Sequence, residues 1–113
     1  MNTLCESYRI IRHTSEEMNV PISEIVSKCR KTDIVQCRQL VSALLRERKW
    51  PFTKIADVFK KNHATIIYNI EMHKIDCKYN EIYRLHFFAI KEMLQTTALF
   101  LLITIKINSI PCL

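Results

Sequence analysis

The stretch from Thr53 to Lys74, TKIADVFKKNHATIIYNIEMHK, predicts two short helices joined by a tight bend. Apolar residues recur at intervals of three and four in both halves, so each helix has one face to bury. These residues are Ile55, Val58 and Phe59 in the first helix and Ile66, Ile67 and Ile70 in the second. The pattern indicates a helix-turn-helix, with the helix from about His63 in the position of the recognition helix.

The bend between the two helices gathers positive charge and small polar groups. Lys60 and Lys61 come first, and the sequence Asn-His-Ala-Thr follows at residues 62–65. Asn62 can cap the second helix by accepting a hydrogen bond from an early backbone N–H group. A helix N-terminus with adjacent lysines suits a phosphate group, and short side chains let it approach base edges. His63 is also compatible with a capping or packing role, and both alternatives stay open.

Upstream of this stretch, the sequence predicts two helices and a basic loop. The first helix covers residues 3–18 and is stopped by Asn19-Val20-Pro21, because proline lacks the N–H group that a helix needs. Its expected inner face consists of Leu4, Tyr8, Ile11 and Met18, with Ser15 as a polar interruption. A short helix then runs from Ser23 to about Lys28, with Ile22, Ile25 and Val26 facing inward. A polar loop with three cations in four residues follows, at residues 27–33.

A long helix is predicted from Ile34 to Lys49, ending at Trp50-Pro51. Its expected buried face is Ile34, Cys37, Val41, Ala43, Leu44 and Leu45. The cationic side chains expected to project from its flanks are Arg38, Arg46 and Arg48, with Gln39 beside the first. Trp50 is expected to fill the core, with packing beneath a DNA backbone contact as the alternative.

Downstream, residues 76–80 read as a break, and a helix is predicted from Glu81 to about Gln95. It carries one apolar stripe of Ile82, Leu85, Ala89 and Met93, and an adjoining stripe of Tyr83, Phe87, Ile90 and Leu94. The tail, residues 96–113, contains eight residues with one polar group, Ala98–Ile105. This run is shorter than the roughly 20 residues of a bilayer span, so we expect no membrane anchor. A helix extension, a packed strand and a dimerising tail stay open.

Composition narrows the class of protein. The chain has 113 residues, of which 49% are hydrophobic and 25% charged, as expected for one folded domain. Glycine is absent, which excludes the P-loop and the dinucleotide fingerprint. The net charge of +6 suits a polyanionic partner, and Lys and Arg strongly outnumber Asp and Glu between Lys28 and Lys61. No pair of carboxylates or of nucleophile and base has catalytic spacing, so we expect no enzyme.

The five cysteines, at positions 5, 29, 37, 77 and 112, include no CxxC pair. With no secretory signal in the sequence, we expect reduced thiols and a cytoplasmic protein. His73 and Cys77 are four residues apart and share a helix face, but no further ligand completes a tetrahedral set. The sequence therefore predicts neither a metal site nor a cofactor.

From Thr14 to Lys74 the chain resembles the C-terminal DNA-binding domain of the bacterial replication initiator DnaA. The similarity rests on three motifs in the same order: Ser27-Lys28-Cys29-Arg30, Arg38-Gln39, and Phe59 followed by Asn62-His63-Ala64-Thr65-Ile66. Ile55, in Lys54-Ile55-Ala56, stands where the family has Ile-Gly. Asn62 replaces the family's Asp, Ala64 replaces its first hydroxyl residue, and Ala56 and Lys60 replace two glycines.

This resemblance implies roles for individual residues. Arg30 would enter the minor groove, where a narrow groove strengthens the attraction of arginine, while Lys28 and Lys31 contact phosphates. Arg38 would support the contacts nearby. The remaining predicted DNA-binding residues are Asn62 and His63 on base edges, Thr65 on a phosphate, and Gln39, Lys54, Lys60, Lys61 and Ala64 around them.

Taken together, the sequence predicts an all-α bundle of five or six helices like domain IV of DnaA, which is related to the Trp repressor fold. Residues 1–95 form the domain, with its helix-turn-helix core at residues 34–75 and the apolar tail at residues 96–113. The expected function is sequence-specific binding of double-stranded DNA by a stand-alone domain, as in a phage or mobile element, with a role in replication initiation or its regulation. The alternative is a helical interaction module, adaptor or antitoxin-like, which forms a homodimer or binds a helical protein through residues 81–107.

Overall fold

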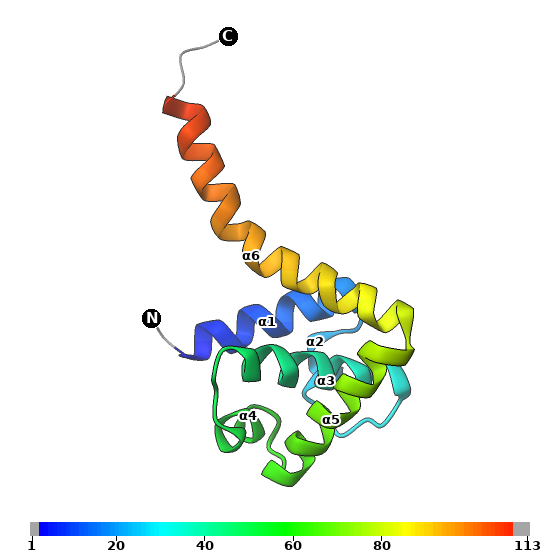
Figure 1. Ribbon diagram of the computed structural model, residues 1–113. Coiled ribbons are helices and arrows are strands. Elements are labelled where there is room, and N and C mark those ends of the chain that lie inside the picture. Colours follow the sequence, from blue (N-terminus) through cyan, green and yellow to red (C-terminus); the bar gives the residue numbers. More distant parts are fainter. Residues whose placement is uncertain (1–2, 110–113) are drawn as a thin grey trace.

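A computed structural model describes the backbone of residues 3–109 and the side chains of residues 6–95 (Figure 1). Within the described backbone every regular element is a helix, which confirms the all-α class and the expected number of helices. In chain order they are α1 (Thr3–Met18), α2 (Ile22–Ile25), α3 (Thr32–Glu47), α4 (Phe52–Phe59), α5 (His63–Tyr79) and α6 (Glu81–Ser109).

The third helix, α3, is the centre of the fold, and each of the other five helices packs against it. It buries every residue from Cys37 to Leu45, because helices cover it on several sides. The expected inner face is confirmed, with Ile34, Cys37, Val41, Ala43, Leu44 and Leu45 all buried. Burying one such aliphatic side chain stabilises the fold by roughly 1.5–3 kcal/mol relative to leaving it exposed. Trp50, just beyond the helix, packs against this core as expected.

Three helices end on a residue in the left-handed conformation, although the chain has no glycine to place there. Asn19, Lys49 and Lys60 have φ angles of 55°, 65° and 54°. After each of them a backbone N–H turns back to the carbonyl five residues earlier, as in a Schellman motif. Left-handed geometry is costly for residues with a Cβ atom, so the packing around these turns must hold it in place.

The bounds of α1 are those expected, but its buried face is rotated from the predicted one. Ile11 is buried and Met18 packs partly against the core, as predicted, but Tyr8 is exposed, and Ile10 and Thr14 are buried instead. The side chain of Leu4 lies outside the described residues. The short helix α2 ends at Ile25, earlier than expected, and Val26 is exposed rather than facing inward. A four-residue helix lacks the length to bury two adjacent turns.

Helix α5 does not break at residues 76–80 as predicted but continues to Tyr79, so that Asn80 alone separates it from α6. The Asn80 side chain accepts a hydrogen bond from the Tyr83 N–H at 3.1 Å, which caps the start of α6. Helix α6 continues past Gln95 to Ser109, so the helix end expected there is wrong. The backbone is thus helical through most of the tail, while its side chains lie outside the described residues.

Of the two apolar stripes on α6, the one formed by Tyr83, Phe87, Ile90 and Leu94 packs into the core. In the other, Ile82 and Leu85 are exposed, while Met93 packs partly against the core. On α5, Ile66 is fully buried and Ile70 partly buried, but Ile67 is exposed, contrary to the predicted stripe.

A buried polar cluster joins α5 to α6. The His73 Nδ1 atom lies 2.7 Å from the Tyr83 hydroxyl, and its ring meets those of Tyr83 and Phe87 edge to face. Burial lowers the pKa of His73 from the ordinary 6.5 to about 4, against the opposing pull of the Asp76 carboxylate. At neutral pH His73 is therefore an uncharged part of the core.

We predict that replacing His73 removes a large part of the acid sensitivity of the fold. Between pH 6.5 and 4 the unfolded chain binds a proton at this residue that the native chain does not. The free energy of unfolding therefore falls as the pH falls, by up to about 3 kcal/mol from this one group. His73→Gln cannot titrate, so urea denaturation across this range should show a correspondingly shallower fall than in the unmodified protein. Tyr83→Phe keeps the buried imidazole and serves as the control that retains the steep fall. An unchanged slope in His73→Gln contradicts the prediction.

Candidate nucleic-acid interface

The predicted helix-turn-helix is present, with α4 and α5 joined by only three residues. Ile55 and Phe59 on α4 and Ile66 on α5 are buried in the common core, which fixes how the two helices cross. Val58 and Ile70 pack partly against the same core. The apolar seam inferred from the sequence therefore exists, apart from Ile67.

The turn between the two helices is tight because Lys60 adopts the left-handed conformation, with φ 54° and ψ 44°. The Lys61 N–H then reaches back to the Ala56 carbonyl at 3.0 Å. Lys60 stands at a position where the resemblance places a glycine. The same turn is thus made here at a steric cost, and it places an exposed cation beside the start of α5.

Asn62 caps α5 as predicted. Its backbone is extended, and its Oδ1 atom accepts a hydrogen bond of 2.9 Å from the Ala64 N–H. The cap satisfies one of the N–H groups that a helix start leaves unpaired, and it fixes the first turn. The first turn contains no acidic residue, so nothing within it opposes an incoming phosphate.

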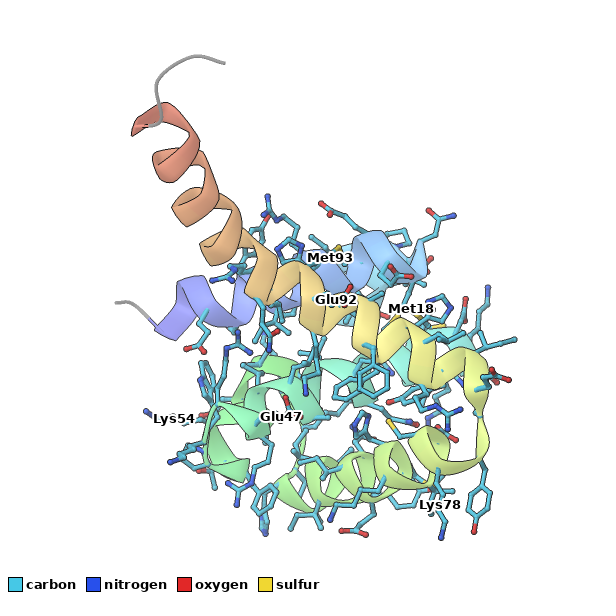
Figure 2. The ribbon with its side chains drawn as sticks, turned by 45° about the horizontal axis from the view of Figure 1, so that its top comes forward. Met18, Glu47, Lys54, Lys78, Glu92 and Met93 are labelled. Carbon is cyan, nitrogen blue, oxygen red and sulfur yellow. The ribbon has the colours of Figure 1, made fainter. Side chains whose placement is uncertain are left out.

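The start of α5 is open to solvent. Asn62, His63, Ala64 and Thr65 are all exposed, as is Lys60, while Lys61 is half-buried. Helix α6 packs on the opposite end of the bundle, so it does not cover this tip (Figure 1). Lys54 is also exposed and projects from α4 at the edge of the molecule (Figure 2). His63 forms none of the described side-chain hydrogen bonds, which argues against a packing role.

The basic loop between α2 and α3 exposes all three of its cations, Lys28, Arg30 and Lys31. Its backbone is ordered by the Ser27 hydroxyl, which donates to the Glu24 carbonyl at 2.6 Å and accepts from the Cys29 N–H at 3.1 Å. In Figure 1 this loop and the start of α5 both lie on the side of the molecule away from α6.

Arg38 does not project from the flank of α3 as expected, because only 7% of its surface is exposed. Its guanidinium group donates to four backbone carbonyls of the segment from α2 to the basic loop. These are the carbonyls of Ile25 at 2.8 Å, Cys29 at 2.6 Å, Ser27 at 2.5 Å and Glu24 at 3.3 Å. Burial lowers the pKa of Arg38, yet a guanidinium stays protonated at any physiological pH. Arg38 therefore fastens the basic loop to α3.

Gln39, predicted beside Arg38 as a DNA-binding residue, is also buried, with 4% of its surface exposed. Its Nε2 atom donates to the Asp76 carboxylate on α5 at 2.8 Å. The Arg-Gln pair thus links α3 to the two elements that carry the exposed site. The sequence did not show that Arg38 and Gln39 are buried, because arginine and glutamine are common on exposed helix faces.

Two residues on the exposed face of α5 were not predicted as part of the site. Ile67 and Tyr68 follow Ala64 by three and four positions, and Tyr68 is 63% exposed. Spacing of this kind places them one turn further along the same face. That periodicity, counted from Ala64, could have identified them. An apolar or aromatic side chain in this position can contact the methyl group of a thymine.

The three cysteines among the described side chains form no disulfide. Cys29, Cys37 and Cys77 are free, while Cys5 and Cys112 lie outside the described side chains. The Cys77 Sγ atom is 3.5 Å from His73 Nε2, but the described residues offer no third ligand that would complete a metal site. Among the described residues, no helix has the length and apolar character to cross a membrane.

Two helices packed across such a bend, with the N-terminal end of the second exposed, place the chain among the helix-turn-helix DNA-binding proteins. Comparison with known families narrows this class. Residues 7–72, more than half of the chain, match the family described as bacterial dnaA protein helix-turn-helix, and the chain belongs to that family.

Curated relatives agree with this membership. The chain is 33% identical over 63 residues to the chromosomal replication initiator protein DnaA of Mycoplasma pneumoniae, and 29% identical over 63 residues to that of Mycoplasma genitalium. It is 31% identical over 64 residues to the chromosomal replication initiator protein DnaA 2 of Protochlamydia amoebophila. The aligned segment covers 55–56% of this chain but only 14% of each relative.

We predict that the cap on α5 contributes measurably to stability. Asn62→Ala removes the acceptor for the Ala64 N–H and should lower the free energy of unfolding by about 1 kcal/mol. Asn62→Asp keeps an acceptor oxygen in the same place and should lie within a few tenths of a kcal/mol of the unmodified protein. Urea denaturation of the three proteins measures both differences. Equal losses in the two variants would show that the cap is not what holds this turn.

Proposed function

We propose that the chain binds duplex DNA in a sequence-specific manner, with α5 in the major groove and the loop at residues 28–31 on the adjacent minor groove and phosphates. The supporting observation is that the two exposed cationic elements are both fastened to α3, one through Arg38 and the other through Gln39. Because the basic loop and the start of α5 are both attached to one rigid helix, they can contact a duplex at a fixed distance from each other.

In this arrangement the exposed residues divide into two kinds of contact. Arg30 enters the minor groove, and Asn62 and His63 face base edges in the major groove. The phosphate contacts come from Lys28, Lys31, Lys54, Lys60, Lys61 and Thr65. Ala64 permits close approach of the helix. Phosphate contacts determine position and affinity, while the few base contacts determine sequence.

Asn62 is the residue that we expect to have the largest effect on which DNA sequence is bound. Its amide can pair in a bidentate manner with N6 and N7 of adenine, whereas the aspartate of the related family accepts from N4 of cytosine. We propose that the preferred site differs from that of the relatives at the base facing Asn62. The relatives are named chromosomal replication initiators, and we propose that this domain acts at a replication origin or in the regulation of one.

The first test is selection of bound sequences from a randomised duplex pool, followed by affinity measurements at several salt concentrations. Affinity should fall steeply with salt, with a log–log slope of about −0.9 for each phosphate contact made. Arg30→Ala should weaken binding by roughly ten- to a hundredfold, and His63→Ala should mainly flatten the base preference. Lys78→Ala removes an exposed cation at the far end of α5 and serves as the matched control. The proposed interface is wrong if neither Arg30→Ala nor His63→Ala binds its selected DNA more weakly than Lys78→Ala does.

A second test concerns Arg38, which we propose acts on DNA only through the loop it holds. Arg38→Lys keeps the positive charge, but a single ammonium group has three donors and cannot span four carbonyls. We expect affinity to fall about tenfold (about 1.4 kcal/mol) with an unchanged salt slope, because no phosphate contact is lost. A flatter slope would show that Arg38 contacts a phosphate directly. Circular dichroism checks that the variant is folded.

A further inference from the structure

One surface of the described protein is explained neither by the family nor by the DNA-binding site. The family match ends at residue 72, before α6 begins. On α6, three large apolar side chains are more than half exposed, namely Ile82 at 69%, Leu85 at 60% and Phe88 at 52%. Exposed apolar side chains that cluster in this way mark interaction surfaces more often than ordinary solvent-facing helix.

Leu85 and Phe88 belong to a regular seam, and Ile82 flanks it. The exposed positions Glu81, Leu85, Phe88, Glu92 and Gln95 are separated alternately by four and three residues, which is the heptad spacing of a coiled coil. In Figure 2, α6 lies in front of the other helices, and no element covers Glu92. The same spacing continues in the sequence at Leu99, Leu102 and Lys106, so the pattern covers nearly four heptads.

The length of α6 also indicates that another molecule packs against it. The helix has 29 residues, which corresponds to about 44 Å. Its later half stands clear of the other helices in Figure 1. A helical segment of this length that packs against nothing is marginal in water, because most helical stability in proteins comes from tertiary packing. Something that covers one side of this segment would supply that packing.

We propose that α6 pairs with α6 of a second copy of this chain in an antiparallel coiled coil. The register that joins opposite charges places Glu81 against the partner's Lys106. Leu85 then meets the partner's Leu102, and Phe88 meets the partner's Leu99. At the centre, Glu92 meets the partner's Gln95, whose amide can donate to the carboxylate. Every apolar position of the seam thus faces another apolar position.

A parallel pair is disfavoured by the same charges. It would set Glu81 against the partner's Glu81 and Glu92 against the partner's Glu92, and like charges in facing positions are repulsive. The antiparallel pair is isologous, which closes the assembly at two copies. Because the seam lies opposite the buried stripe of α6, pairing there leaves the core and the exposed start of α5 untouched.

The test is the mass of the 113-residue chain in solution, measured by sedimentation equilibrium across micromolar concentrations. We expect a dimer, and we expect Leu85→Glu to be monomeric while its circular dichroism shows a folded bundle. Tyr68→Glu introduces the same charge at an exposed site on α5 and is the matched control, which should stay dimeric. A monomeric unmodified chain, a mass that keeps rising beyond two copies, or a dimer that survives Leu85→Glu overturns the proposal.

Charge reversal tests the orientation. Glu81→Lys alone and Lys106→Glu alone should each weaken the dimer at low salt, because each places like charges together. The double variant restores opposite charges and should recover the dimerisation constant to within about threefold. In a parallel pair the double variant keeps the like-charge contacts, so a lack of recovery overturns the antiparallel register. DNA binding of these variants is measured separately, and a loss of the dimer with intact DNA affinity leaves the DNA-binding site assignment standing.

Discussion

The buried guanidinium of Arg38 is the interaction on which the exposed site depends. It brings a positive charge into the protein with no carboxylate among the described residues to meet it, and four backbone carbonyls take that place. A buried charge is tolerated only when its donors are satisfied, so the carbonyls must stay where they are. The path of the chain from Glu24 to Cys29 is therefore set by a residue on α3. The basic loop, which has no regular secondary structure, is thereby held in a fixed position relative to α3.

Helix α5 is attached to α3 as well, by a different set of contacts. Gln39 holds Asp76, and the neighbouring His73 packs against Tyr83 and Phe87 of α6. These contacts lie near the C-terminal end of α5, while the apolar seam with α4 holds its beginning. Both ends of α5 are thus held in place, and the side chains on its outer face do not take part in the packing. Exposed side chains such as His63 and Tyr68 can change with little cost to the core, because they contribute little to it.

Much of this arrangement could be predicted from the sequence, and the failures share a cause. The helix-turn-helix, the Asn62 cap and the long buried helix follow from local spacing and capping chemistry, which act over a few residues. The exposed Tyr8 and Ile67 and the buried Arg38 depend on which neighbour covers each face, and periodicity carries no information on that. The continuation of α5 to Tyr79 was missed because polar residues from Asp76 to Asn80 resemble a loop. In the structure, Gln39 engages Asp76 and a carbonyl in that stretch accepts from Arg84.

The single residue between α5 and α6 has a mechanical consequence. Asn80 is the only non-helical position between His63 and Ser109, so the two helices form one bent rod. The bend is braced by Arg84, which donates to the Cys77 carbonyl at 3.1 Å, and by the Asn80 cap on α6. A force applied along α6 is consequently transmitted to the exposed start of α5. A molecule that binds the far end of α6 can therefore change the orientation of the exposed start of α5.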